Sequence, residues 1–396
     1  MTDPTPSSAQ SGVGRRQIVA GAAWTIPAIA FATATPSFAA SRCVPNRTHE
    51  ASRPAVGTSP NRASSEWTVP AGVTRVEYEV VGAQGGSDGN DVGRGSKVTG
   101  FLTVTPGQVL TLIVGQGGYA SPDYGITATG IPGGQGFGNG GNSGANPSLL
   151  NTFNSGSGGG GSAILVGTAP IVVAGGGGGG GDGIGIQMPN VNPNPFTYGP
   201  RTGGNGGDPG GSAVNRVGTW TTRGRQITFN GGAGANGAVG GAGGATSAAY
   251  PASPPPTDYS TLAGSAGGNY VAGAGGNGGN GAAVTSTVAL NPDNGGSQVA
   301  RGGTTGGGGG GGYAGGGGGG TIAVGYGIAG TPSVANPAAQ FASSSGGGGG
   351  SSFVSPTAVG GVTSSVGLFE LGPAPVDATT ARTPGSITLK YCAPTV

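Results

Sequence analysis

Residues 306–320 read GGGGGGGYAGGGGGG, a glycine tract broken only by Tyr313 and Ala314. Further unbroken glycine runs lie at 158–161, 175–181 and 346–350, and residues 275–281 form the triplet phrase GGNGGNG. Glycine loses more backbone entropy on ordering than any other residue, so one such tract by itself predicts a flexible linker. Several tracts within one chain suggest instead that they pack against one another.

A polyglycine-II helix is the conformation that would allow such packing. It has three residues per turn, a rise of about 3.1 Å per residue and no internal hydrogen bonds, so a run of six or seven glycines spans roughly 20 Å. Each amide and carbonyl points outward and needs a partner, which a neighbouring rod supplies only if no side chain separates the two backbones. The alternative is a disordered Gly/Ser tract.

The composition limits the class of protein. The chain has 396 residues, with 96 Gly, 30 Pro, 8% charged residues and a formal net charge of +2. So much Gly and Pro predicts low complexity, but disordered chains usually carry a high net charge as well. Nucleic-acid binding requires clustered Lys and Arg, which this balance does not offer. We expect an ordinary apolar core for roughly 100 to 150 residues, with the glycine segments making up the rest.

The N-terminal segment resembles a secretion signal. Arg15 and Arg16 precede an apolar run that reaches Thr35, and Ala39 stands at a cleavage position formed by small residues. Paired arginines before such a run are typical of bacterial twin-arginine export, with the export machinery as partner. A membrane anchor is the alternative, although the run is barely long enough to span a bilayer. We therefore predict a signal peptide at 1–39, a linker at 40–64, a glycine-rich domain at 65–396, and a secreted or cell-surface protein with no membrane contact after cleavage.

Cys43 and Cys392 are the only cysteines, and they flank almost all of the mature chain. In an exported protein this arrangement predicts one disulfide between the N-terminal segment and the last strand. A metal or redox site is the alternative, but two cysteines and the single histidine of the chain make a poor ligand set.

A β framework surrounds the glycine runs. Residues 75–81 alternate apolar and charged side chains, which is the period of a half-buried strand. We expect strands at 97–104 and 109–114 joined as a hairpin by the turn between them, a second pair at 162–166 and 170–174, and a closing strand at 385–391. The sequence predicts an all-β fold, with two sheets or one curled sheet fastened to an array of polyglycine rods.

Four long insertions, 119–157, 184–230, 250–262 and 321–345, are expected to lie outside the glycine lattice. They carry aromatic residues that are candidates for partner contact, because exposed aromatics on loops of a rigid scaffold often form recognition surfaces. The alternative is that these side chains pack within their own loops. The candidates are Phe196, Tyr198, Trp220, Tyr250 and Tyr259.

The order of phrases resembles a known domain. WTVPAGVT at 67–74, VGAQGG at 81–86, VTPGQ at 104–108, VGQGG at 114–118 and GSSFV at 350–354 follow one another in a similar order in the glycine-rich domain of secreted bacterial proteins. The chain is similar in this respect to the extracellular glycine-rich domain of the anaplastic lymphoma kinase and leukocyte tyrosine kinase receptors. The resemblance implies an all-β fold in which a β-sandwich-like framework is interwoven with a bundle of polyglycine-II helices, and which binds an extracellular ligand. It does not imply kinase activity, because the chain has no kinase signature.

The sequence offers no convincing catalytic residue, cofactor motif or metal site. His49 has no nucleophile near it in sequence, and the carboxylates are scattered. The phrase GGSDGND at 85–91 is more typical of an Asp/Asn/Gly turn than of a calcium loop. We therefore expect a secreted, non-enzymatic binding or adhesion scaffold that presents loops to an extracellular protein or glycan. The alternative is a structural component of the cell envelope or surface matrix that associates with itself.

Overall fold

A computed structural model describes the chain from Val44 onward, with gaps. The described residues are 44–52, 63–86, 92–119, 130–145, 155–181, 183–186, 196–198, 203–204, 210–213, 216–220, 225–248, 258–290, 298–326, 339–363 and 383–393. They belong to one compact unit, Val44–Val396. Every regular element among them is a β-strand in an antiparallel sheet, and none is a helix. The expected all-β class is therefore confirmed.

Two five-stranded sheets form a sandwich. The first sheet contains, in spatial order, β1 (Arg47–Ser52), β20 (Ser386–Tyr391), β3 (Arg75–Val81), β4 (Lys97–Thr103) and β19 (Ala358–Thr363). The second sheet contains β18 (Phe353–Val354), β7 (Ala169–Ala174), β6 (Ser162–Val166), β5 (Val109–Val114) and β2 (Ala63–Thr68). The sequence predicted β3, the β6–β7 pair and β20, and all three are confirmed.

Apolar side chains from both sheets meet between them in one core. Leu110, Leu112 and Ile164 of the second sheet and Ile387 and Leu389 of the first are fully buried there. The alternation within β3 produces this arrangement, because its apolar residues are buried while Glu77 and Glu79 remain partly exposed. The alternation of apolar and charged residues in β3 thus places its apolar side chains in the sandwich core, as the sequence indicated.

Tyr78 occupies space that two cross-strand glycines leave open. Its register partner on β4 is Gly100, which in turn faces Gly360 on β19. A Cβ at Gly100 would lie 2.6 Å from the Tyr78 hydroxyl oxygen. These glycines therefore serve the packing of an aromatic ring within a sheet, a role different from that of the glycine runs.

The expected hairpin of residues 97–104 and 109–114 is wrong. β4 pairs with β3 and β19 in the first sheet, whereas β5 pairs with β2 and β6 in the second. The amide of Gly107 donates to the carbonyl of Val69 and that of Val69 to Gln108, so the turn bonds to the chain before β3. The connection therefore crosses between the sheets, and the apolar residues Val98 and Leu102 of β4 share one core with Leu110 and Leu112 of β5.

The remaining strands form three smaller sheets. They comprise β8 (Gly183–Ile186), β9 (Phe196–Tyr198), β10 (Arg216–Trp220), β11 (Arg225–Phe229), β12 (Thr246–Ala248), β13 (Asp258–Leu262), β14 (Ala283–Leu290), β15 (Gln298–Thr305), β16 (Thr321–Tyr326) and β17 (Ala339–Ser344). Their spatial orders are β12-β11-β10-β9, β13-β16-β17-β8 and β14-β15.

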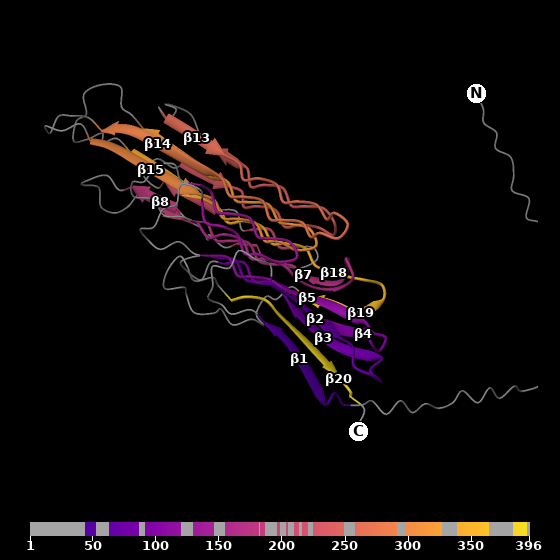
Figure 1. Cartoon of the computed structure of the whole chain (residues 1–396). Coiled ribbons are helices and arrows are strands. Elements are labelled where there is room, and N and C mark those ends of the chain that lie inside the picture. Colours follow the sequence, from indigo (N-terminus) through magenta and orange to yellow (C-terminus); the bar gives the residue numbers. More distant parts are fainter. Residues whose placement is uncertain are drawn as a thin grey trace, which may run out of the picture. The chain divides into compact units, whose positions relative to one another are not determined.

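Glycine-rich segments run between the sandwich and these smaller sheets, and we call the set the glycine lattice. It comprises residues 82–86, 92–96, 115–119, 130–145, 155–161, 175–181, 203–204, 210–213, 230–245, 263–282, 306–320 and 345–351. In Figure 1 the segments lie side by side between strands β13 to β15 and strands β5, β7 and β18. Several segments continue directly into strands, as 175–181 does from β7.

The expectation that the four insertions lie outside the lattice is wrong in part. Residues 130–145, 203–204 and 210–213 are lattice members whose backbones bond to other glycine segments. In 130–145 the glycines are interrupted by exposed or partly exposed residues at about every third position, namely Pro132, Gln135, Asn139, Asn142 and Ala145. In contrast, 321–326 and 339–344 form strands, as segments outside the lattice should.

The N-terminal part of the described chain joins the first sheet. β1, which lies within the segment expected to be a linker, pairs with β20 along its whole length. Cys392, just after β20, is disulfide-bonded. Its predicted partner Cys43 lies outside the described residues, so the pairing stays a prediction. Arg15, Arg16, Ala39 and Tyr250 also lie outside them.

Candidate functional site

Each inner segment of the lattice is surrounded by other backbones. Segment 306–312 donates amide hydrogen bonds to 276–282, 345–348 and 156–159, and accepts them from 141–144, 316–319 and 176–179. The partner repeats every third residue: Gly306, Gly309 and Gly312 donate to residues 282, 279 and 276. Segment 175–181 likewise donates to 308–311, 83–86 and 204, and accepts from 347–350, 156–159 and 93–96. An inner segment therefore has six neighbours and bonds to each through the backbone.

The close approach of these backbones excludes side chains. A Cβ at Gly309 would overlap the carbonyl oxygen of Gly316, and one at Gly178 would overlap that of Gly347. Obligatory backbone hydrogen bonding thus replaces side-chain packing as the means of excluding water.

Hydroxyl side chains satisfy the backbone where lattice segments end. Near the sandwich, the Ser352 hydroxyl accepts from the Gly175 amide at 3.0 Å and lies 2.7 Å from the Ser96 hydroxyl, while Ser162 accepts from Gly115 at 3.0 Å. Toward the smaller sheets, Ser345 accepts from Gly320 at 3.0 Å. Small hydroxyls suit these positions because they cap a backbone group without separating the segments.

Three aromatic rings stack at the sandwich end of the lattice. Tyr270 and Tyr313 have ring centroids 4.2 Å apart at 20°, and Tyr313 and Phe353 are 4.3 Å apart at 11°. The rings pack on Phe137 and on the apolar face of β5, β6 and β7. Burial raises the pKa of the Tyr313 hydroxyl, and the electrostatic effect of the neighbouring Tyr270 raises it further. The tyrosine that interrupts the longest glycine tract therefore anchors it to the sandwich.

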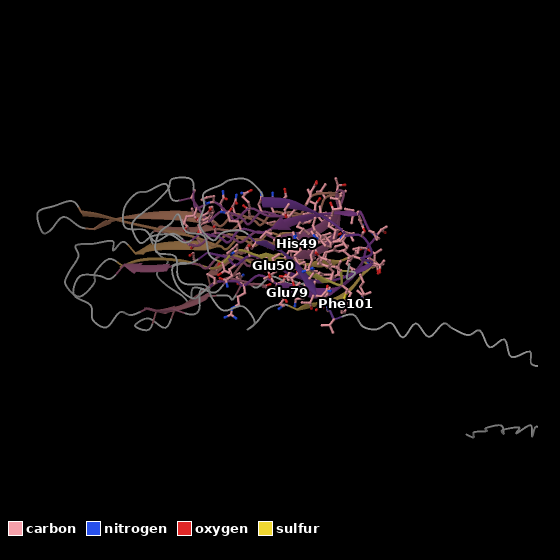
Figure 2. The ribbon with its side chains drawn as sticks, turned by 60° about the horizontal axis from the view of Figure 1, so that its bottom comes forward. His49, Glu50, Glu79 and Phe101 are labelled. Carbon is pink, nitrogen blue, oxygen red and sulfur yellow. The ribbon has the colours of Figure 1, made fainter. Side chains whose placement is uncertain are left out.

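The solvent face of the first sheet is polar apart from Phe101 and its register partner Val359, both of which are exposed. Figure 2 labels Glu50, Glu79 and Phe101 there. The Glu79 carboxylate forms a 2.7 Å ion pair with Lys97, and the Arg75 guanidinium lies 3.9 Å from the centre of the Phe101 ring. Such an exposed ion pair contributes little to stability.

His49 belongs to the packing of the sandwich edge. Its ring lies 5.8 Å from that of Trp67, which lies 5.3 Å from Tyr391. Among the described residues, no group of three or more His, Cys, Asp or Glu could hold a metal ion. None of the described segments is a helix long and apolar enough to cross a membrane.

The structure brings three of the candidate aromatic residues into one sheet. Phe196 on β9 is the register partner of Trp220 on β10, and Tyr198 is the partner of Gly218. Because directly paired residues share a face, Phe196, Tyr198 and Trp220 lie on one face of that sheet. Tyr259 lies apart, on β13, opposite Val324.

Sequence reasoning missed an outer layer of the lattice. Among the described residues, segment 275–282 has neighbours on four sides, namely 264–268, 316–319, 306–312 and 138–142, and segment 138–144 likewise has four described neighbours. Asn277 and Asn280 are exposed there, and Asn139 and Asn142 are partly exposed, as is Gln135 a few residues earlier in the chain. We call these five residues the amide face. The three-residue spacing of the asparagines was the signal that could have revealed it.

Asparagine side chains on this face bond to the backbone of the next segment. The Asn277 Oδ1 accepts from the Asn139 amide at 3.0 Å, and the Asn280 Oδ1 accepts from the Asn142 amide at 2.9 Å. The Asn139 and Asn142 Oδ1 atoms accept from Gly136 and Gly133, each at 3.0 Å. The side-chain amides thus satisfy donors that lattice neighbours would satisfy in an inner layer.

Comparison with known proteins does not identify a family. No protein-family model matches the chain, and no curated protein is significantly similar to it. The resemblance to the glycine-rich receptor domain therefore stays a prediction.

Proposed function

We propose that this protein is a secreted, non-enzymatic binding or adhesion scaffold in which polyglycine-II helices hold strands and loops in position for an extracellular partner. The observation that carries the proposal is the lattice itself. A three-residue repeat of hydrogen-bond partners with six neighbours around each inner segment supports the polyglycine-II conformation. Such a lattice is rigid because moving one segment would break hydrogen bonds to several others.

Many lattice segments lead directly into strands of the smaller sheets. Segments 275–282, 315–320 and 175–181 lead toward β14, β16 and β8, while β15 and β17 lead back into 306–312 and 345–350. Recognition residues are commonly carried on connections held by a rigid framework. The resemblance to the glycine-rich receptor domain supports the same interpretation, with an extracellular protein or glycan as partner and no cofactor.

Replacing single connections tests this proposal. Residues 291–297 join β14 to β15, and residues 327–338 join β16 to β17; in each variant the connection becomes Asn-Gly, which matches a two-residue antiparallel hairpin. The full chain and both variants are applied to a panel of purified bacterial wall polymers and extracellular polysaccharides.

The proposal predicts that the full chain binds a member of the panel and that at least one replacement abolishes binding while the melting temperature is unchanged. If every polymer that binds the full chain also binds both variants with unchanged affinity, the role of these connections is contradicted.

Self-association is a second candidate function, favoured by the corner segment 264–270. Its described neighbours are 241–244, 277–280 and 315–318, so three of the six sides that an inner segment covers have no described neighbour. Within the described chain, the amides of Ala266 and Asn269 have no backbone acceptor. Sedimentation velocity over a range of concentrations tests this candidate, which predicts growing polymers, whereas a binding scaffold stays monomeric.

A further inference from the structure

We propose that the amide face binds a neutral, linear polysaccharide. This inference goes beyond the proposed function because it concerns the side of the lattice and not the strand connections. It would hold even if those connections bound nothing.

The face presents hydrogen-bond donors in fixed positions. Because the Oδ1 atoms of Asn139, Asn142, Asn277 and Asn280 are held by backbone amides at 2.9 to 3.0 Å, each side chain has a set orientation. Their NH₂ groups make no hydrogen bond to another described residue, and Asn277 and Asn280 are exposed. A ligand that accepts hydrogen bonds would meet donors that are already ordered, which lowers the entropy lost on binding.

The donors repeat along the segments. Asn139 and Asn142, like Asn277 and Asn280, are three residues apart, which corresponds to about 9 Å at the rise of such a helix. The two pairs lie on adjacent segments, so the donors form two parallel rows. A partner that is itself linear and repeating could use both members of a row, and a small ligand could not.

Chemistry excludes the other classes of partner. Residues 130–145 and 263–282 contain no Asp, Glu, Lys or Arg, so the face offers nothing to a phosphate backbone or a charged polymer. It also lacks the large apolar or aromatic anchors that dominate protein interfaces, since Val271, an exposed apolar residue of 263–282, lies in the turn beyond the asparagines. A neutral polymer rich in hydroxyl groups remains as the fitting partner.

Asparagine-to-aspartate substitution tests the donors without disturbing the lattice. In N277D/N280D the remaining Oδ1 still accepts the backbone amide, but the outward donor becomes a carboxylate oxygen. N277A/N280A removes the groups altogether. N236D, at an exposed asparagine outside the amide face, makes the same chemical change elsewhere.

Affinity electrophoresis of the full chain through gels containing hydroxyethyl cellulose, glucomannan or dextran measures binding, with polygalacturonate as the anionic control. We expect retardation of the wild type by at least one neutral polymer and a loss of about tenfold or more in affinity in both double variants. N236D and the two connection variants should bind as the wild type does, and melting temperatures confirm that each variant is folded.

Three results would overturn the inference: no retardation of the wild type by any neutral polymer, affinity within about twofold of wild type in both double variants, or a wild-type dimer that the double variants abolish. The last would make the face a contact between two copies. If binding is lost in the connection variants but kept in both asparagine double variants, this inference is contradicted and the proposed function is supported.

Discussion

The sandwich and the glycine lattice exclude water by opposite means. In the sandwich, strands are separated by fully buried side chains such as Leu110, Leu112 and Ile164, and the sheets meet through those side chains. In the lattice, segments such as 306–312 are buried just as fully, but there backbone packs directly on backbone, and hydrogen bonds between backbones take the place of apolar side-chain contacts. The comparison teaches that burial alone does not predict how a position responds to substitution: the sandwich should suffer from lost side-chain volume, and the lattice from added volume.

The largest effect should come from adding one methyl group inside the lattice. In Gly309→Ala the new Cβ would overlap the Gly316 carbonyl, and the six surrounding segments leave that backbone no room to move. We expect a loss of about 4 kcal/mol or more in the free energy of unfolding, at the upper end for overpacking. Urea denaturation followed by circular dichroism measures it.

Gly361→Ala is the matched control. A Cβ at Gly361, in the exposed strand β19, has no heavy atom within 4 Å. Its stability should change by less than about 1 kcal/mol. Equal losses in the two variants would erase the distinction between lattice and sheet glycines.

A smaller effect is expected from removing volume in the sandwich. Leu112→Ala should cost about 3 kcal/mol, because it loses buried apolar contacts and leaves a cavity that the sheets fill only partly. Equilibrium unfolding in urea measures this loss as well. A loss below about 1 kcal/mol would mean that the sandwich core does not behave as an ordinary close-packed core.

The smallest effect concerns the Tyr78 hydroxyl, which is buried and has no hydrogen-bond partner among the described residues. Tyr78→Phe should raise stability at neutral pH by about 1 kcal/mol, because it removes an unsatisfied polar group. Burial also raises the pKa of Tyr78 above its ordinary value of 10.0. The folded state then holds the proton more tightly than the unfolded state, so stability is lost as the pH rises above 10.

Melting temperatures measured from pH 8 to 11 test this prediction. The fall above pH 10 should be shallower in the variant than in the wild type but still present, because the pKa of Tyr313 is raised as well. Identical curves would show that Tyr78 ionises equally easily in both states.

Strand positions could be predicted wherever side chains alternate, as in β3, because the alternation is local. The partnership of β4 and β5 could not, because a five-residue connection fits both a hairpin and a crossing between sheets. Sheet membership depends on the distant strands β2 and β19, which no local pattern reveals. Segment 130–145 was missed as a lattice member since outward residues interrupt its glycines, although their three-residue spacing was present in the sequence.

The candidate sites divide in a similar way. The aromatic residues on the insertions were predicted as candidates for partner contact because of their residue type. The strand register then placed Phe196, Tyr198 and Trp220 on one face of a sheet. The amide face was not predicted, because the sequence analysis grouped 275–281 with the glycine segments and gave its asparagines no role of their own. Their role follows from the hydrogen bonds between Asn277 and Asn139 and between Asn280 and Asn142, which join residues 138 positions apart in the chain.

Amide hydrogen exchange of the folded chain tests the lattice most directly. If segment 306–312 is held on all sides by backbone hydrogen bonds, its amides should exchange only through global unfolding and be protected as strongly as those of β5. The amides of Ala266 and Asn269, on the open corner segment, should exchange quickly. Exchange of residues 306–312 within the dead time, with β5 still protected, would show that the glycine runs are flexible linkers and contradict the account.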